Sequence, residues 1–130
     1  MKENKNRIIV SAELIMYGSV TICLEDDGNR CITSYIAIAD GGSVVSHGEK
    51  KYDGINTSEL IDRITSNYST MSEEDDGVIW KLFCAKEETA VVSIDENSWG
   101  RDKLLSLIKL IQSYIKDDEP LADLKELALF

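Results

Sequence analysis

Apolar and polar residues alternate through the first part of the chain, and a period of two predicts β-strands. The first strand is expected over residues 8–16, where the apolar positions of one parity are Ile8, Val10, Ala12, Leu14 and Met16. After a short turn at residues 17–19, a second strand is expected to carry Val20, Ile22 and Leu24. A third strand is expected over residues 30–39, and the turn residues 40–42 lead into a short fourth strand over residues 44–47.

The connection between the second and third strands decides which of their residues pair. Asp26-Asp27-Gly28 is a hairpin signal. A two-residue turn at Asp27-Gly28 would scatter the isoleucines of the third strand over both faces. A three-residue loop pairs Ile22 with Ile32 and gathers the aliphatic residues on one face, so we prefer it, since the buried face sets the register. This register places Cys23 directly across from Cys31, on the other face.

The apolar spacing becomes helical after residue 55. Asn56 is suited to cap a first helix, and Glu59 follows three positions later, as in a capping box. The apolar stripe of this helix consists of Leu60, Ile61, Ile64 and Tyr68. The acidic stretch 69–77 is expected to be a solvated loop.

Two further strands are expected over residues 78–86 and 89–95, followed by a helix over residues 101–116. The apolar positions of this helix are Leu104, Leu105, Leu107, Ile108, Ile111, Tyr114 and Ile115. Pro120 suits the first turn of a short terminal helix. That helix is too short to persist alone, so its leucines should dock on their own domain: Leu121, Leu124 and Leu127.

The order ββββ-α-ββ-α-α predicts an α+β fold, with a mainly antiparallel sheet and helices packed on one face. A chain of 130 residues falls in the range of one domain. We therefore expect a single domain over residues 1–130, with residues 117–130 as a short C-terminal helical extension of it.

The charge balance is strongly acidic, with 14 Lys and Arg against 24 Asp and Glu and a net charge of −10. Phosphate backbones and anionic membranes attract cationic surfaces, so neither nucleic acid nor membrane is expected as a partner. A basic protein is the natural partner, although acidity can also serve only solubility. No window approaches the length of a membrane span, and the N-terminus lacks a signal-peptide pattern, so a cytoplasmic location is expected.

No residue pattern indicates a catalytic centre, and we expect no catalytic residue, cofactor or metal. His47 is the only histidine and has no neighbours that suggest a triad. Together with Cys23, Cys31 and Cys84 it lacks the C-x-x-C spacing of zinc sites, and cysteines in strands are usually small buried hydrophobes. The glycines form no phosphate-binding loop. A small enzyme built from unremarkable residues stays open as an alternative.

Acidic clusters at the connections between elements are the candidate partner-binding residues, although loop charges can also be merely solvated. The candidates are Glu73, Glu74, Asp75, Asp76, Asp117, Asp118 and Glu119. Trp99, in the connection before residue 101, could anchor a partner or pack beneath the helix that follows. Trp80 lies in a strand and is expected in the core.

Small size, acidity, early strands and a helical end together resemble the immunity proteins of bacterial toxin systems, in particular those of contact-dependent growth inhibition. The resemblance covers the whole chain as size, charge and element order, with Trp99-Gly100 as its one local feature. It implies a one-to-one complex with a cognate toxin domain, often a nuclease, whose basic active site the acidic loops would cover. The alternative is an acidic secretion chaperone. Chaperones of that class usually open with an amphipathic helix, whereas residues 8–16 of this chain alternate like a strand, which counts against this alternative.

Overall fold

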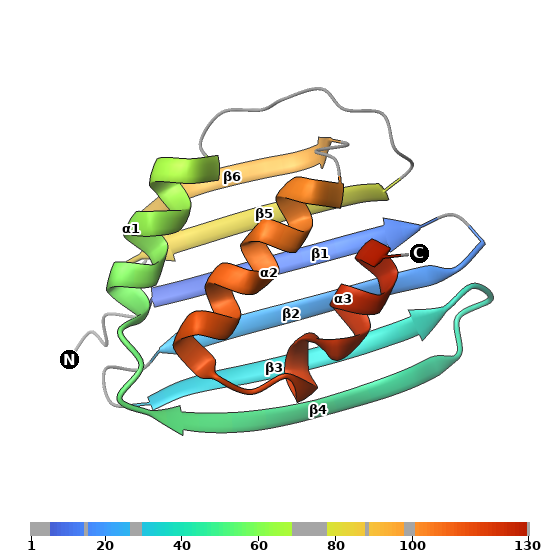
Figure 1. The fold of residues 1–130 in the computed structure, drawn as a ribbon, viewed down its shortest axis with the longest axis horizontal. Coiled ribbons are helices and arrows are strands. Elements are labelled where there is room, and N and C mark those ends of the chain that lie inside the picture. Colours follow the sequence, from blue (N-terminus) through green and yellow to red (C-terminus); the bar gives the residue numbers. More distant parts are fainter. Residues whose placement is uncertain are drawn as a thin grey trace.

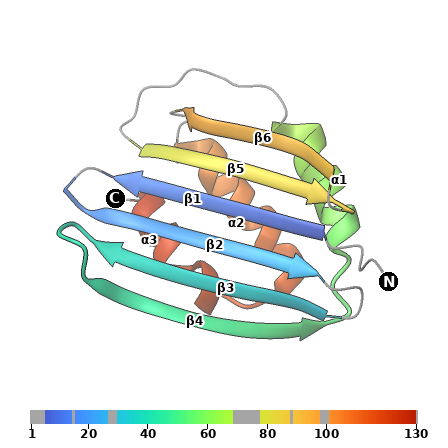
Figure 2. The same ribbon diagram turned by 180° about the vertical axis from the view of Figure 1, so that it is seen from behind.

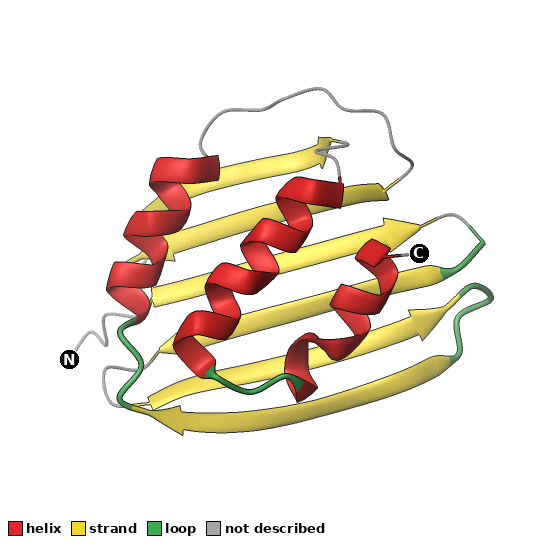
Figure 3. Cartoon of the chain, viewed as in Figure 1, coloured by secondary structure: helices red, strands yellow, loops and turns green. Residues whose placement is uncertain are grey.

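The computed structural model describes residues 6–14, 16–26, 30–68, 78–87, 89–97 and 101–129. Its elements follow the order ββββ-α-ββ-α-α, so the predicted α+β fold is confirmed (Figure 3). The strands are β1 (Asn6–Leu14), β2 (Gly18–Asp26), β3 (Arg30–Ala39), β4 (Val44–Asp53), β5 (Val78–Lys86) and β6 (Thr89–Asn97). The helices are α1 (Thr57–Tyr68), α2 (Arg101–Ile115), the 3-10 turn η1 (Glu119–Leu121) and α3 (Ala122–Leu129).

One six-stranded sheet organises the fold, with strand order β4-β3-β2-β1-β5-β6 and antiparallel pairing between all neighbours. The three helices cover the same face of this sheet (Figure 1). Seen from behind, the other face carries none of the described helices (Figure 2). The described part of the chain therefore forms two layers with one uncovered sheet face.

Several of the expected strand bounds differ from the structure: the first strand begins at Asn6 rather than at residue 8, and the last ends at Asn97 rather than at residue 95. The first strand ends at Leu14, and Met16 lies in the turn with a positive φ of 71° and 84% of its surface exposed. The fourth strand extends to Asp53 rather than ending at residue 47. This longer strand matters because its second half contacts the C-terminal segment.

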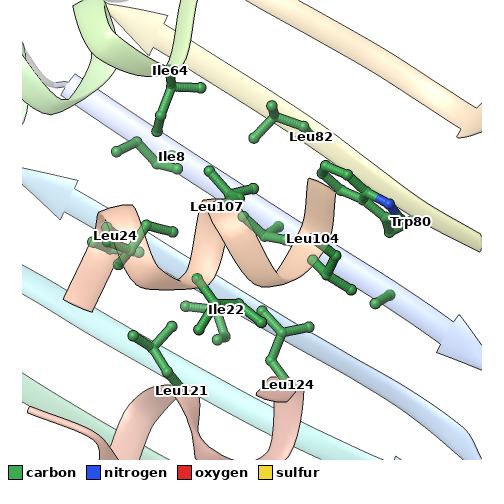
Figure 4. Packing of buried hydrophobic residues seen from close by; sticks show 14 of the residues in the cluster. Ile8, Ile22, Leu24, Ile64, Trp80, Leu82, Leu104, Leu107, Leu121 and Leu124 are labelled. Carbon is green, nitrogen blue, oxygen red and sulfur yellow. The ribbon is translucent and has the colours of Figure 1, made fainter. Parts of the chain in front are cut away.

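The core lies between the sheet and the helices. Residues of one parity on β1, β2 and β5 point toward α2, among them Ile8, Ile22 and Trp80 (Figure 4). Trp80 is 1% exposed, which confirms its predicted core position. From α2, Leu104 and Leu107 pack into the same cluster. Full burial of each such side chain contributes about 1.5–3 kcal/mol.

The start of α1 follows the predicted capping pattern. The backbone N–H of Glu59 donates to Asn56 Oδ1 over 3.0 Å, and Asn56 Nδ2 donates to Glu59 Oε2 over 3.3 Å. The first contact satisfies one of the free N–H groups at the helix start. All members of the predicted apolar stripe are buried: Leu60, Ile61, Ile64 and Tyr68.

The C-terminal segment docks on its own chain, as predicted. Leu121, Leu124 and Leu127 are fully buried in the common core. The turn η1 lies against β3 and β4, and α3 lies over β1 and β2. The terminal helix is therefore part of the helical layer.

The expected register between β2 and β3 is wrong. Ile22 pairs with Tyr35, not with Ile32, and Asp26 pairs with Cys31. Cys23 consequently lies on the uncovered face, whereas Cys31 is buried on the helical side. The last pair, Asp26 with Cys31, leaves four residues between its members, one more than the preferred loop.

The error has a physical reason in the composition of β3. Its helix-facing positions hold Tyr35 and three smaller residues, Cys31, Thr33 and Ala37. The isoleucines of this strand, Ile32, Ile36 and Ile38, are half-buried on the uncovered face. Isoleucine parity therefore indicated the wrong side of this strand.

Candidate protein-binding surface

The sequence-predicted site residues separate into two groups. Glu73, Glu74, Asp75, Asp76 and Trp99 lie outside the described residues. Asp117, Asp118 and Glu119 form the link from α2 to η1 and begin η1. Only this second group can be placed next to other side chains.

Asp117 and Glu119 are held by side chains of the sheet, in a group we call the Lys50 cluster: Tyr35, Lys50, Tyr52, Asp117 and Glu119. Lys50 Nζ donates to Asp117 Oδ2 over 3.0 Å, and the Tyr52 hydroxyl donates to the same oxygen over 2.7 Å. Lys50 also forms an ion pair with Glu119, and the Tyr35 hydroxyl donates to Glu119 Oε1 over 3.3 Å. The cluster ties the start of the C-terminal segment to β3 and β4.

These contacts shift the protonation equilibria of the cluster toward its charged form. The Tyr52 hydroxyl and then Lys50 lower the pKa of Asp117 to about 2. Lys50 likewise lowers the pKa of Glu119, and the two carboxylates raise the pKa of Lys50. At neutral pH the ammonium and both carboxylates are therefore charged and engaged with one another.

The sequence contained a signal for this cluster, but the fourth strand was expected to end at residue 47, before Lys50 and Tyr52. Lys50 and Tyr52 share one parity on β4, and that parity faces the helical layer, while Glu49 and Lys51 face the uncovered side. A strand read through to Asp53 would have placed a cation and a hydroxyl beneath the acidic link. Two of the predicted partner-binding carboxylates thus also have a structural task.

Asp118 points into a different environment. Gln112 Nε2 donates to Asp118 Oδ1 over 3.0 Å. Both residues line a groove of about 470 Å³ between α2 and α3. The other lining residues are Ala122, Lys125, Glu126 and Leu129. Leu129 is 63% exposed, so this groove offers an apolar side chain beside carboxylates.

A second groove, of about 240 Å³, follows the opposite side of α3. It combines the carboxylates of Asp123 and Glu126 with apolar side chains that include Val20 and Val45. The Tyr17 hydroxyl also lines it and hydrogen-bonds Glu126; burial and this carboxylate raise the pKa of Tyr17. We name Asp118, Asp123, Glu126 and Leu129 the α3 surface.

This arrangement suits cationic side chains of a protein. The aliphatic stem of Lys or Arg can lie on apolar groups while its charge meets a carboxylate. On the α3 surface, Leu129 and the nearby Val45 supply the apolar contact, and Asp118, Asp123 and Glu126 supply the charge.

The uncovered sheet face has a different character. Among its described side chains the basic residues are Arg7, Arg30, Lys51 and Lys81, and the acidic ones are Glu13, Glu25, Glu49 and Asp53. The salt bridges Arg7–Glu25 and Arg30–Asp53 lie on this face. Its described side chains are therefore charge-balanced, on a chain whose net charge is −10.

Within the described residues, no group of three or more His, Cys, Asp or Glu side chains could hold a metal ion. Burial raises the pKa of Cys31 to about 11 and that of Cys84 to about 12, so both thiols stay protonated and weakly nucleophilic. His47 is exposed at the edge of the uncovered face. No helix in the described part of the chain is long and apolar enough to cross a membrane.

Comparisons with protein-family models, curated proteins and solved structures find no match to this chain.

Proposed function

We propose that this chain is a protein-binding inhibitor that neutralises a basic toxin domain, as an immunity protein does. The observation that carries the proposal is the α3 surface, where carboxylates flank two grooves that also offer apolar side chains. A net charge of −10 supports it, because complementary fields speed the encounter with a basic partner.

The inhibitor would act by occupying cationic side chains that the toxin uses to bind an anionic substrate. Asp118, Asp123 and Glu126 would pair with those side chains, and the apolar residues beside them would exclude water. The Lys50 cluster holds η1 in place, so the surface would be organised before binding and would lose little conformational freedom. The acidic run 73–76 stays a predicted part of the same interface.

A growth assay with the product of the neighbouring gene tests this function. The protein encoded next to this chain would be expressed in a sensitive host, alone or together with the wild-type chain. We expect that neighbour to be toxic and the chain to protect against it. The variant Asp118→Asn/Asp123→Asn/Glu126→Gln should lose protection, because it removes the charges of the α3 surface.

A matched variant controls for the change in net charge. Glu13→Gln/Glu49→Gln/Asp53→Asn removes three carboxylates from the uncovered face and should protect like the wild type. A nontoxic neighbour, or equal protection by both triple variants, would contradict the proposal. A neighbour whose secretion, rather than toxicity, depends on this chain would favour the secretion chaperone.

A further inference from the structure

The uncovered face of the sheet is a broad surface with apolar side chains. Ile79 is 40% exposed, and Ile9, Ile36 and Phe83 on the same face are half-buried. The six strands lie about 4.8 Å apart, and about seven residues of each span the face, so its projected area is roughly 700 Å². Charged and hydroxyl side chains share this area with the apolar ones, so the apolar part of the face is smaller than the whole.

The charges on this face argue against a basic occupant. Four cations balance four anions among its described side chains, so these hold no surplus of carboxylates to attract such a protein. A second copy of the chain brings an identical balanced face. A cation of one copy can then face an anion of the other, provided that the symmetry places opposite charges together.

One symmetry does so for Arg7 and Glu25. A twofold axis parallel to the strands and midway between β1 and β2 sets β1 of one copy over β2 of the other at the same level. Because Arg7 pairs with Glu25 within the sheet, Arg7 would face Glu25 of the second copy. The same axis sets β5 over β3, so that Ile79 would face Ile38 of the second copy.

We propose that two copies of this chain associate through their uncovered faces about this axis. The product is a sandwich of two aligned sheets with the helical layers outside, a packing that twisted sheets adopt at about −30°. The roughly 700 Å² of projected face approaches the 800 Å² or so that each partner buries in a standard stable interface. The proposal does not rest on the proposed function, since the α3 surface lies on the opposite side.

Sedimentation equilibrium over a range of concentrations tests the association. Wild-type protein at about 50 µM should show twice the chain mass of 14.5 kDa. Ile79→Lys should weaken the dimer at least about tenfold, because it places an ammonium against Ile38. Leu129→Lys makes the same change at an exposed position on the helical side and should leave the dimer intact. A wild-type monomer at this concentration, or a dimer that Ile79→Lys leaves intact, would overturn the proposal.

A charge swap keeps the test valid if Ile79→Lys disturbs folding. Arg7→Glu should weaken the dimer, because it places two glutamates opposite each other. Arg7→Glu/Glu25→Arg should restore it, because the pair is only exchanged. Equal association constants for the wild type, the single and the double variant would refute the proposed symmetry.

The thiol of Cys23 gives an independent readout. It is half-buried on the uncovered face, whereas Cys31 and Cys84 are buried beneath the helices. Its reaction rate with a disulfide reagent should fall as the protein concentration rises, since a second copy would cover it. A rate that does not change with concentration in a dimeric sample would show that the copies meet elsewhere and would overturn the proposal.

Discussion

The ring of Tyr35 on β3 lies against Gly48, its directly paired residue on β4. A Cβ atom at position 48 would lie 2.5 Å from Tyr35 Cζ and 2.9 Å from Cε1, closer than real side chains approach. The missing side chain leaves room for the ring, and the Tyr35 hydroxyl beyond it donates to Glu119. Gly48 thereby makes space for a contact between the sheet and the C-terminal segment.

We expect Gly48→Ala to lower the free energy of unfolding by about 1–3 kcal/mol, because the added methyl must displace the ring. Urea denaturation of the two proteins measures the change. In a Tyr35→Ala background the same substitution should cost much less, since no ring occupies the space. An equal cost in both backgrounds would assign the effect to the strand rather than to the ring.

Acid should weaken the Lys50 cluster through its carboxylates. The pKa of Asp117 is about 2 in the folded chain against an ordinary 3.8. A carboxyl whose pKa is lowered by folding stabilises the fold above its unfolded pKa, and this contribution is lost as the pH falls from 3.8 toward 2. Glu119 changes in the same direction. Asp117→Asn should therefore flatten the acid limb of a plot of urea midpoint against pH.

The alkaline limb provides the control for this interpretation. The pKa of Lys50 is raised above its ordinary 10.5, so the stability that it contributes is complete below pH 10.5 and is lost above it. Lys50→Met should lower the urea midpoint at neutral pH. It should also make the midpoint depend less on pH in both the acid and the alkaline range. Acid limbs of equal slope in wild type and Asp117→Asn would show that the cluster does not contribute.

The buried leucines of the C-terminal segment should contribute strongly to stability. Leu124→Ala removes a fully buried side chain and should cost about 2–5 kcal/mol. Leu129→Ala, at a position 63% exposed, is the matched control and should change the thermal midpoint little. Truncation after Asp118 removes all three buried leucines and should lower the midpoint further. An unchanged midpoint after truncation would refute docking of this segment on its own sheet.

Local patterns were sufficient to predict most of the fold. The alternation in β1 and β2, the capping residues Asn56 and Glu59, and Pro120 at the start of η1 act over a few residues. Each lies where its pattern predicted, apart from the end of β1. The order of these elements then restricted the fold to a sheet with helices on one face.

The register of β3 could not be predicted in the same way, because it depends on which face the helices cover. Both faces of β3 carry apolar residues, Ile32 and Ile36 on one and Cys31 and Ala37 on the other. The contact of β3 with η1, which is distant in sequence, lies on the face that holds Cys31 and Ala37. Lys50 and Asp117 are likewise distant in sequence. The charge of the link from α2 to η1 could therefore mark it as a candidate binding segment, but could not predict its attachment to β4.

Quantitative affinity capture tests the central claim, that a basic protein binds the α3 surface. The wild-type chain, the α3-surface triple variant and the uncovered-face triple variant would be immobilised, and proteins retained from the native host would be compared by mass spectrometry at low and high salt. We predict a basic protein retained by the wild type and by the uncovered-face variant, but lost from the α3-surface variant and reduced by high salt. Retention of the same partner by all three chains, with no dependence on salt, would contradict the account.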